Sequence, residues 1–508
     1  MRSLILRFNP PIPSIISAAS QTGCDHTKAN PMSRLPYDPA DGGKFWEAIR
    51  ELPGFPKHEN MPIKHMLFES DALFKLPEIL KSVGARQDQP LIVVMDETPM
   101  RRAGQDLKPQ IRAVLRRDGW QVRDCILLPD ASGQVHTDMP HSLEVQRNLS
   151  AGCAVLSVGS GVVTDIAKHG CYLFQQETGE RLPFVVYQTA NSVSAFTSNM
   201  SPTFVDGVKR TLDSRYPDAL ICDLETLRDA PMEMTVGGVG DMLAVFVSFP
   251  DWLLAHRLGM DESYSELAKN LVGPLRELLL EHAKGIRTGE LESVAMLAKI
   301  IALGGLAMSL SHATTPMSGF EHVMSHVVDL QAEMEHAPLA VHGSQVALAT
   351  LAGAEMYRRF LSDFEPGALT ISNCYPSAES MKTLIEKNFL VVDPTGKAGA
   401  ECWADYSQKL EKWHAHRADF ESVLRNWDVV RTELEAETCL PEEIREILLS
   451  VGAPARWSLL QPPVEETGAR FAFMNASLMR KRLTLGDLLI FSQWDRESIW
   501  KKIWLDCA

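Results

Sequence analysis

The sequence has few cysteines, no excess of positive charge and no long uninterrupted apolar run. Nine cysteines are scattered over 508 residues without a CxxC pair, which is typical of reduced thiols in the cytoplasm. The 50 lysines and arginines are outnumbered by 65 acidic residues, giving a net charge of −15 that argues against nucleic-acid binding. The most apolar stretch, at 299–311, is shorter than the roughly 20 residues that a membrane-spanning helix needs. We therefore expect a cytoplasmic protein with no membrane span and no nucleic-acid partner.

The composition that remains is that of a globular protein with more than one domain. Hydrophobic residues make up 45% and charged residues 23% of the chain, so disorder is excluded as the dominant state. The first thirty residues carry no acid before Asp25 and could be a targeting leader, but prolines interrupt any helix there. We expect residues 1–55 to form an N-terminal extension, disordered over its first thirty residues.

Short apolar runs and helical stretches alternate through the next part of the chain. The runs read as buried parallel strands, and they lie at 91–95, 121–129, 153–160 and 183–189. Helical spacing of apolar residues follows two of these runs, at 103–117 and 162–174. This alternation predicts a doubly wound parallel sheet, and we expect a Rossmann-like domain over residues 56–205.

The pattern changes to helices alone beyond about residue 225. We therefore expect an α/β domain followed by an all-helical domain over residues 206–508, with a ligand-binding cleft between them. Residues 365–440 are rich in acidic residues and contain several tryptophans. Their apolar pattern is less regular than that of the neighbouring segments, and it indicates no catalytic or binding function.

One candidate binding motif is the turn SVGSGVVTD at 157–165. Gly159 and Gly161 let backbone N–H groups approach a pyrophosphate, and the helix that follows favours its negative charge. Asp96, directly after an earlier strand, could accept hydrogen bonds from a ribose. The alternatives are an ordinary strand–helix turn and a helix N-cap.

A second candidate is the pair His322 and His326 in EHVMSH, which share one helical face. With His342 downstream and Asp241 upstream, they would suit a zinc-like divalent ion, although spacing alone does not show that they meet. Without a metal, they would be core or surface histidines. A third segment, TANSVSAFTS at 189–198, could line a nicotinamide or phosphate, or could simply cap the next helix.

Taken in order, these segments resemble the sn-glycerol-1-phosphate dehydrogenase family, within the group of 3-dehydroquinate synthases and iron-containing alcohol dehydrogenases. The resemblance extends from about residue 60 to 355, with a weaker match at 476–489. It is carried by VGSGVVTDIAK, TANS…S, FVDGVKRT, ICDLETLRDAPMEMTVGGVGDML, the DW at 251–252, SGFEHVMSH and VHGSQVALAT.

The resemblance implies a set of site residues and a homodimer. It implies that Asp241, His322 and His342 bind one divalent metal, zinc in most members, with nickel or iron possible. His326 and Asp241 would contact the substrate and act in catalysis. NAD(P) would contact Asp96 and, by resemblance, Gly159, Ser160, Gly161, Val162, Val163, Thr189, Ala190, Asn191, Ser192 and Ser198.

The activity implied by the resemblance is the NAD(P)H-dependent reduction of dihydroxyacetone phosphate to sn-glycerol 1-phosphate, a step of phospholipid metabolism. The small phosphorylated substrate needs a counter-ion, for which Lys209 and Arg210 are candidates unless they are merely solvated charges.

Three positions depart from the family pattern. Ser194 replaces an Asp that normally touches substrate, Val245 replaces a Lys four residues after the metal-binding Asp, and Ser344 replaces a Glu. Because the metal and cofactor motifs are intact, these departures favour a changed substrate, such as a phosphonate or another ketone, over a dead enzyme. Two further hypotheses are a cyclase or lyase like dehydroquinate synthase and a degenerate, non-catalytic binding protein.

Overall fold

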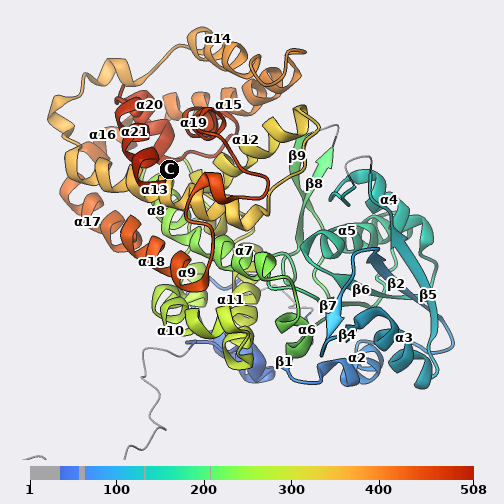
Figure 1. The fold of residues 1–508 in the computed structure, drawn as a ribbon. Coiled ribbons are helices and arrows are strands. Elements are labelled where there is room, and N and C mark those ends of the chain that lie inside the picture. Colours follow the sequence, from blue (N-terminus) through green and yellow to red (C-terminus); the bar gives the residue numbers. More distant parts are fainter. Residues whose placement is uncertain (1–34, 57–62, 131–132, 206–207, 508) are drawn as a thin grey trace, which may run out of the picture.

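The computed structural model describes residues 35–56, 63–130, 133–205 and 208–507. A parallel sheet with flanking helices occupies one side of the molecule, and a larger set of helices occupies the other (Figure 1). A β-hairpin formed by β8 (Met200–Val205) and β9 (Val208–Asp213) stands between these two parts (Figure 1). The expected fold class, an α/β domain followed by a helical one, is confirmed.

The sheet has six strands in the order β1-β10-β7-β6-β2-β5, and every neighbouring pair is parallel. The inner strands β7, β6 and β2 are continuous apolar runs because helices cover both faces. The strands are β1 (His65–Glu69), β2 (Pro90–Asp96), β5 (Gln121–Leu127), β6 (Ala154–Gly159), β7 (Phe184–Gln188) and β10 (Ala219–Asp223).

Helices α2 (Leu76–Ser82) and α3 (Leu107–Arg117) pack on one face of the sheet. On the other face, α4 (Met139–Asn148) and α5 (Gly161–Thr178) share a core with the helical part of the molecule. The face that carries α5 is therefore continuous with the helices that follow.

The chain order of the strands reverses between β2 and β6, and open parallel sheets bind ligands at such a point. Val94 of β2 pairs with Ser157 of β6, so Asp96 and Gly159, two residues further on, lie at the same carboxyl edge. Both residues had been singled out from the sequence, and the topology places them at this edge.

Three expected boundaries differ from the structure. The sheet extends past residue 205 because β10 returns to it after the β8–β9 hairpin, so we propose a domain boundary near residue 223. The first turn of the helix expected at 103–117 is instead the second half of a two-stranded ribbon, β3 (Arg101–Arg102) and β4 (Gln105–Asp106), after which α3 begins. Within the expected extension 1–55, α1 (Gly43–Arg50) buries Phe45 and Ile49 in the core, whereas residues 1–34 lie outside the described part.

The rest of the chain is helical. Residues 365–440, expected to be less regular, form four helices; Trp413 and Trp427 are buried, and Trp403 is partly buried. The helices are α6 (Leu224–Arg228), α7 (Met232–Leu243), α8 (Val245–Arg257), α9 (Glu266–Val272), α10 (Leu275–Thr288), α11 (Leu291–Leu310), α12 (Phe320–Met334), α13 (His342–Asp363), α14 (Ala378–Phe389), α15 (Lys397–Ala415), α16 (Arg417–Arg425), α17 (Trp427–Glu437), α18 (Pro441–Val451), α19 (Glu466–Asn475), α20 (Leu485–Phe491) and α21 (Arg496–Cys507).

Two helical stretches, Met232–Arg257 and Leu291–Leu310, are long and apolar enough to cross a membrane. Most of each apolar window, 72% and 78%, is buried inside the protein. Helices in the core of a large domain have this composition because they are surrounded by apolar neighbours.

Candidate metal and cofactor site

Glycines allow helices α7 and α13 to touch backbone to backbone. A Cβ added to Gly343 would lie 1.8 Å from the carbonyl oxygen of Gly237, and one added to Gly240 would lie 2.1 Å from that of Gly343. No side chain fits between the two helices at these positions. This close crossing brings Asp241, near the end of α7, next to His342, the first residue of α13.

Asp241, His322 and His342 converge from three helices on one point. Each offers one ligand atom, and these atoms all lie within 4.8 Å of one another. Oδ1 of Asp241 lies 3.3 Å from Nε2 of His322. One carboxylate and two imidazoles form a donor set that suits a divalent transition-metal ion with open positions for a substrate.

Neighbouring side chains orient the two imidazoles. Glu321, fully buried, lies 2.8 Å from Nδ1 of His322, which leaves Nε2 to face Asp241. The hydroxyl of Ser325 lies 3.3 Å from Nδ1 of His342. Such outer partners fix the ring and tautomer of metal-binding histidines, so the arrangement fits a metal centre.

The electrostatics of this cluster favour a bound cation. Burial alone would raise the pKa of Asp241, but the hydrogen bond and charge of His322 outweigh it and lower the pKa. Burial opposes a charge on His322 too, yet its hydrogen bonds to Asp241 and Glu321 raise its pKa to about 9. Two buried carboxylates thus hold a proton on an imidazole, and a metal ion would take the place of that proton.

The loop at 189–198 contacts this cluster through Ser194. The backbone N–H and the hydroxyl of Ser194 donate to Oδ2 of Asp241 at 3.0 and 3.1 Å. The loop reaches α7 because Gly238 has no side chain: a Cβ there would lie 2.1 Å from the carbonyl oxygen of Asn191. The position that departs from the family pattern therefore touches the carboxylate of Asp241.

The same loop also contacts the glycine turn after β6. The N–H of Thr189 donates to the carbonyl of Gly159 at 3.1 Å. A Cβ on Gly161 would lie 2.3 Å from a methyl group of Val193, so the start of α5 touches the loop. The loop therefore joins the glycine turn to the cluster of Asp241, His322 and His342, through Val193 at one contact and Ser194 at the next.

Several residues expected to bind the cofactor have their side chains occupied within the protein. Asn191 is fully buried, donates to the carbonyl of Val294 at 3.1 Å and accepts a hydrogen bond from Gln188. The hydroxyl of Ser198 accepts from the N–H of Met200. Both carboxylate oxygens of Asp96 accept from Thr98, and Val163 and Ala190 are buried. Direct contact of these side chains with NAD(P) stays a prediction. Ser160 and Val162, by contrast, are partly exposed at the glycine turn, so their side chains can be reached from solvent.

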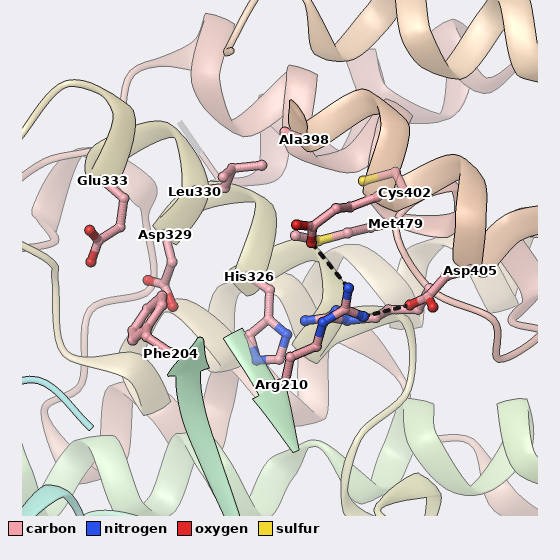
Figure 2. Close-up of a pocket in the computed structure, with 12 residues that line it drawn as sticks. Phe204, Arg210, His326, Asp329, Leu330, Glu333, Ala398, Cys402, Asp405 and Met479 are labelled. Atoms are coloured by element: carbon pink, nitrogen blue, oxygen red, sulfur yellow. Dashed lines mark hydrogen bonds and ion pairs between the residues drawn. The ribbon is translucent and has the colours of Figure 1, made fainter. Parts of the chain in front are cut away.

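His326, one turn beyond His322 on α12, lines a small, partly open pocket of about 30 Å³. Its ring is stacked on that of His342, with centroids 5.9 Å apart. Figure 2 shows Arg210 in the same pocket, held by carboxylates of α15. Arg210 pairs with Glu401 at 3.0 Å and Asp405 at 3.3 Å, so its charge is already compensated. The side chain of Lys209, the other candidate, lies outside the described part of the structure.

The other two departures from the family pattern are buried. Val245 is 3% exposed and Ser344 is 5% exposed, on α8 and α13 respectively. At Val245, four residues beyond Asp241, an apolar side chain therefore occupies an enclosed position where the family tends to carry an amine.

Two positioning residues were missed by the sequence analysis. Asp251 accepts hydrogen bonds from the N–H of Phe320 at 2.8 Å and from the hydroxyl of Tyr357 at 2.7 Å. It thereby fixes the start of α12, the helix that carries His322; the DW motif was the available signal. Lys168 of α5 is fully buried and donates to the carbonyl of Ala195 at 3.0 Å, holding the loop at 189–198 against α5.

Comparison with known proteins shows which proteins share this fold. The sequence profile of iron-containing alcohol dehydrogenases matches residues 67–231. Among solved structures, an iron-containing alcohol dehydrogenase from Thermococcus thioreducens superposes with a TM-score of 0.52 at 13% identity, covering 87% of this chain and 98% of that one. NADH-dependent butanol dehydrogenase A from Thermotoga maritima gives a TM-score of 0.51 at 15% identity, covering 89% and 98%. The fold is that of the iron-containing alcohol dehydrogenase class.

Sequence relatives narrow this class. Glycerol-1-phosphate dehydrogenase [NAD(P)+] of Bacillus subtilis is 30% identical over 287 residues, which cover 56% of this chain and 70% of the relative. The protein of the same name from Geobacillus stearothermophilus is 26% identical, covering 69% and 76%. The chain belongs to the glycerol-1-phosphate dehydrogenase family, as its motifs predicted, and is an oxidoreductase of that family.

Proposed function

We propose that the protein is a metal-dependent NAD(P)H dehydrogenase that reduces a small phosphorylated ketone, by default dihydroxyacetone phosphate to sn-glycerol 1-phosphate. The main support is the loop at 189–198, which contacts both the glycine turn after β6 and the metal-binding carboxylate. A cofactor bound at the glycine turn and a metal bound by Asp241, His322 and His342 would therefore both lie close enough to act on the same substrate. The names of the relatives support the same reaction.

In this proposal Asp241, His322 and His342 hold one divalent ion, zinc by default, with nickel or iron as alternatives. When bound, this ion would supply Lewis-acid polarisation of a carbonyl oxygen, and an NAD(P)H held at the glycine turn would supply the hydride. Gly159 and Gly161 leave room for the cofactor pyrophosphate at the start of α5, an 18-residue helix whose N-terminal N–H groups favour an anion.

His326 and Ser194 complete the substrate site. His326 faces the pocket beyond the metal cluster, where its imidazole can donate a proton to the substrate oxygen as the alcohol forms. Ser194 offers a hydroxyl where the family usually offers a carboxylate. Because Arg210 is already paired with two acids, we assign the substrate phosphate to Lys209 or to other cations near the pocket.

A substitution of His322 tests the assignment. His322→Ala removes one of three metal donors, so the purified variant should lose its metal and its NADH oxidation with dihydroxyacetone phosphate. NADH binding, followed by fluorescence, should persist because the glycine turn is untouched. The control is His414→Ala, which removes an exposed histidine from α15. Full activity in the His322 variant would refute the assignment.

We also propose a cytoplasmic homodimer. Seven cysteines have side chains that the structure describes, and all seven are free thiols and buried, as expected in a reducing compartment. Sedimentation of the purified protein tests the dimer: a monomer at micromolar concentration would contradict it.

A further inference from the structure

A second cavity adjoins the His326 pocket, between β9, α15 and the segment 480–482. It holds about 730 Å³, is open to solvent and is lined by three acidic side chains, Asp261, Glu262 and Asp405. Six cationic side chains also line it: Arg210, Lys409, Lys412, Arg480, Lys481 and Arg482. Such an excess of cations is notable because the chain as a whole carries a net charge of −15.

Some of these cations have structural partners. Lys409 is fully buried and forms an ion pair with Asp487 at 2.7 Å. Arg482 donates to the hydroxyl of Thr314 at 2.8 Å and to the carbonyl of Ser318. These contacts hold α15 and the segment 480–482 in place and thereby define the walls of the cavity.

Other cations in the lining are not neutralised in this way. Lys412 and Lys481 form no ion pair with another described residue. Lys412 is partly buried, whereas Lys481 is exposed at the rim. Both ammonium groups are therefore available to an incoming anion.

The arginines also repel one another. Burial, together with the nearby charge of Arg480, lowers the pKa of Arg482 to about 10. The pKa of Arg480 is lowered by burial too; the charge of Asp405 opposes this shift, and the charge of Arg210 adds to it. Like charges gathered beside a cavity are stabilised when an anion binds between them, and guanidinium groups bind phosphate oxygens well.

The cavity and the His326 pocket share three lining residues, Arg210, Asp405 and Arg480. An anion held in the cavity therefore lies next to the substrate pocket. The cavity holds about 730 Å³, within the range of about 300–1,000 Å³ of pockets that enclose drug-sized ligands, so it has room for a ligand larger than a triose phosphate.

We propose that this cavity binds a multiply charged phosphate group, such as a diphosphate, that forms the anionic end of the substrate. The ketone would lie at the metal cluster and the phosphates among Lys412, Arg480 and Lys481. The anion site stands on its own residues; that its occupant belongs to the substrate rests on the proposed dehydrogenase function.

Inorganic pyrophosphate is the probe. Its binding is measured by calorimetry on the metal-loaded protein saturated with NADH, so that the cofactor turn is already filled. The test variant is Lys412→Ala/Lys481→Ala, and the control is Lys284→Ala/Lys387→Ala, which removes two exposed lysines on α10 and α14. Both variants change the net charge equally, so only the test variant removes charge from the cavity.

We expect the test variant to bind pyrophosphate at least about tenfold more weakly, because two charged contacts are lost. The control should stay within about twofold of the wild type. Equal binding in all three proteins, or equal loss in both variants, would overturn the anion site. Pyrophosphate could also bind the metal itself, so the measurement is repeated with His322→Ala. Binding that disappears there would likewise overturn the proposal.

Competition kinetics test the link to the substrate. Pyrophosphate should inhibit reduction of dihydroxyacetone phosphate competitively with that substrate, and noncompetitive inhibition would overturn the assignment to the substrate end. If the enzyme shows no turnover with dihydroxyacetone phosphate, the proposed default activity fails, yet the calorimetric comparison still decides whether the anion site exists.

Discussion

The close contact between helices α7 and α13 can be tested at Gly343. In a Gly343→Ala variant the new methyl group would lie 1.8 Å from the carbonyl oxygen of Gly237, where carbon and oxygen normally stay about 3.3 Å apart. The two helices must therefore separate by roughly 1.5 Å, or one of them must shift by that amount along its axis. Metal–ligand distances tolerate only about 0.2 Å, so Asp241 and His342 could no longer share one ion.

We expect this variant to lose about 1–3 kcal/mol of the free energy of unfolding through overpacking. Its metal content per folded chain, measured by mass spectrometry after gel filtration, should fall well below that of the wild type. Gly43→Ala is the matched control, because Gly43 also lies at a helix start and an added Cβ meets nothing within 4 Å. Wild-type metal content and stability in Gly343→Ala would refute the argument that glycine is required there.

Three other predictions follow from single contacts. Burial lowers the pKa of His322, but the hydrogen bonds of its imidazole raise that pKa to about 9. Because zinc must displace the imidazole proton, zinc affinity should tighten about tenfold per pH unit from pH 7 to 9. A Kd for zinc that does not change over this range would contradict the prediction. Lys409→Met would leave Asp487 buried without its cation and should cost about 3–5 kcal/mol in urea unfolding. Lys409→Met/Asp487→Asn should lose less, and an equal or greater loss would argue against the ion pair as the cause. Ser194→Asp should raise kcat/KM for dihydroxyacetone phosphate by about tenfold, the value of one charge-assisted hydrogen bond. No gain in folded, metal-loaded protein would mean that Ser194 does not set substrate choice.

Much of the fold could be predicted because buried parallel strands and amphipathic helices leave periodic patterns. The runs at 91–95, 153–160 and 183–189 became central strands since both of their faces meet helices. The edge strand β1 and the short β10 were missed. β7 is equally short, but β1 begins at His65 and ends at Glu69, so it does not form an apolar run, and β10 joins the sheet through neighbours that are distant in sequence.

The candidate site shows the same division. The sequence indicated which types of residue could bind a metal and showed the helical spacing of the histidines in EHVMSH. It also indicated the glycine turn at 157–165. Glu321 was overlooked although it precedes His322 directly, because sequence does not show which carboxylate reaches the far side of an imidazole. Arg210 was proposed for phosphate, yet its partners come from α15, some 190 residues later.

The sequence by itself determined the family, the strand–helix alternation and the chemical types of the metal donors, since these depend on local pattern and residue identity. Only the tertiary structure decided that Asp241, His322 and His342 meet, that Ser194 touches that cluster, and that α15 lines a cationic cavity beside it. These outcomes depend on how closely helices can approach, which is set by backbone contacts at glycines such as Gly240 and Gly343. Contacts between segments a hundred residues apart leave no periodic trace in the chain.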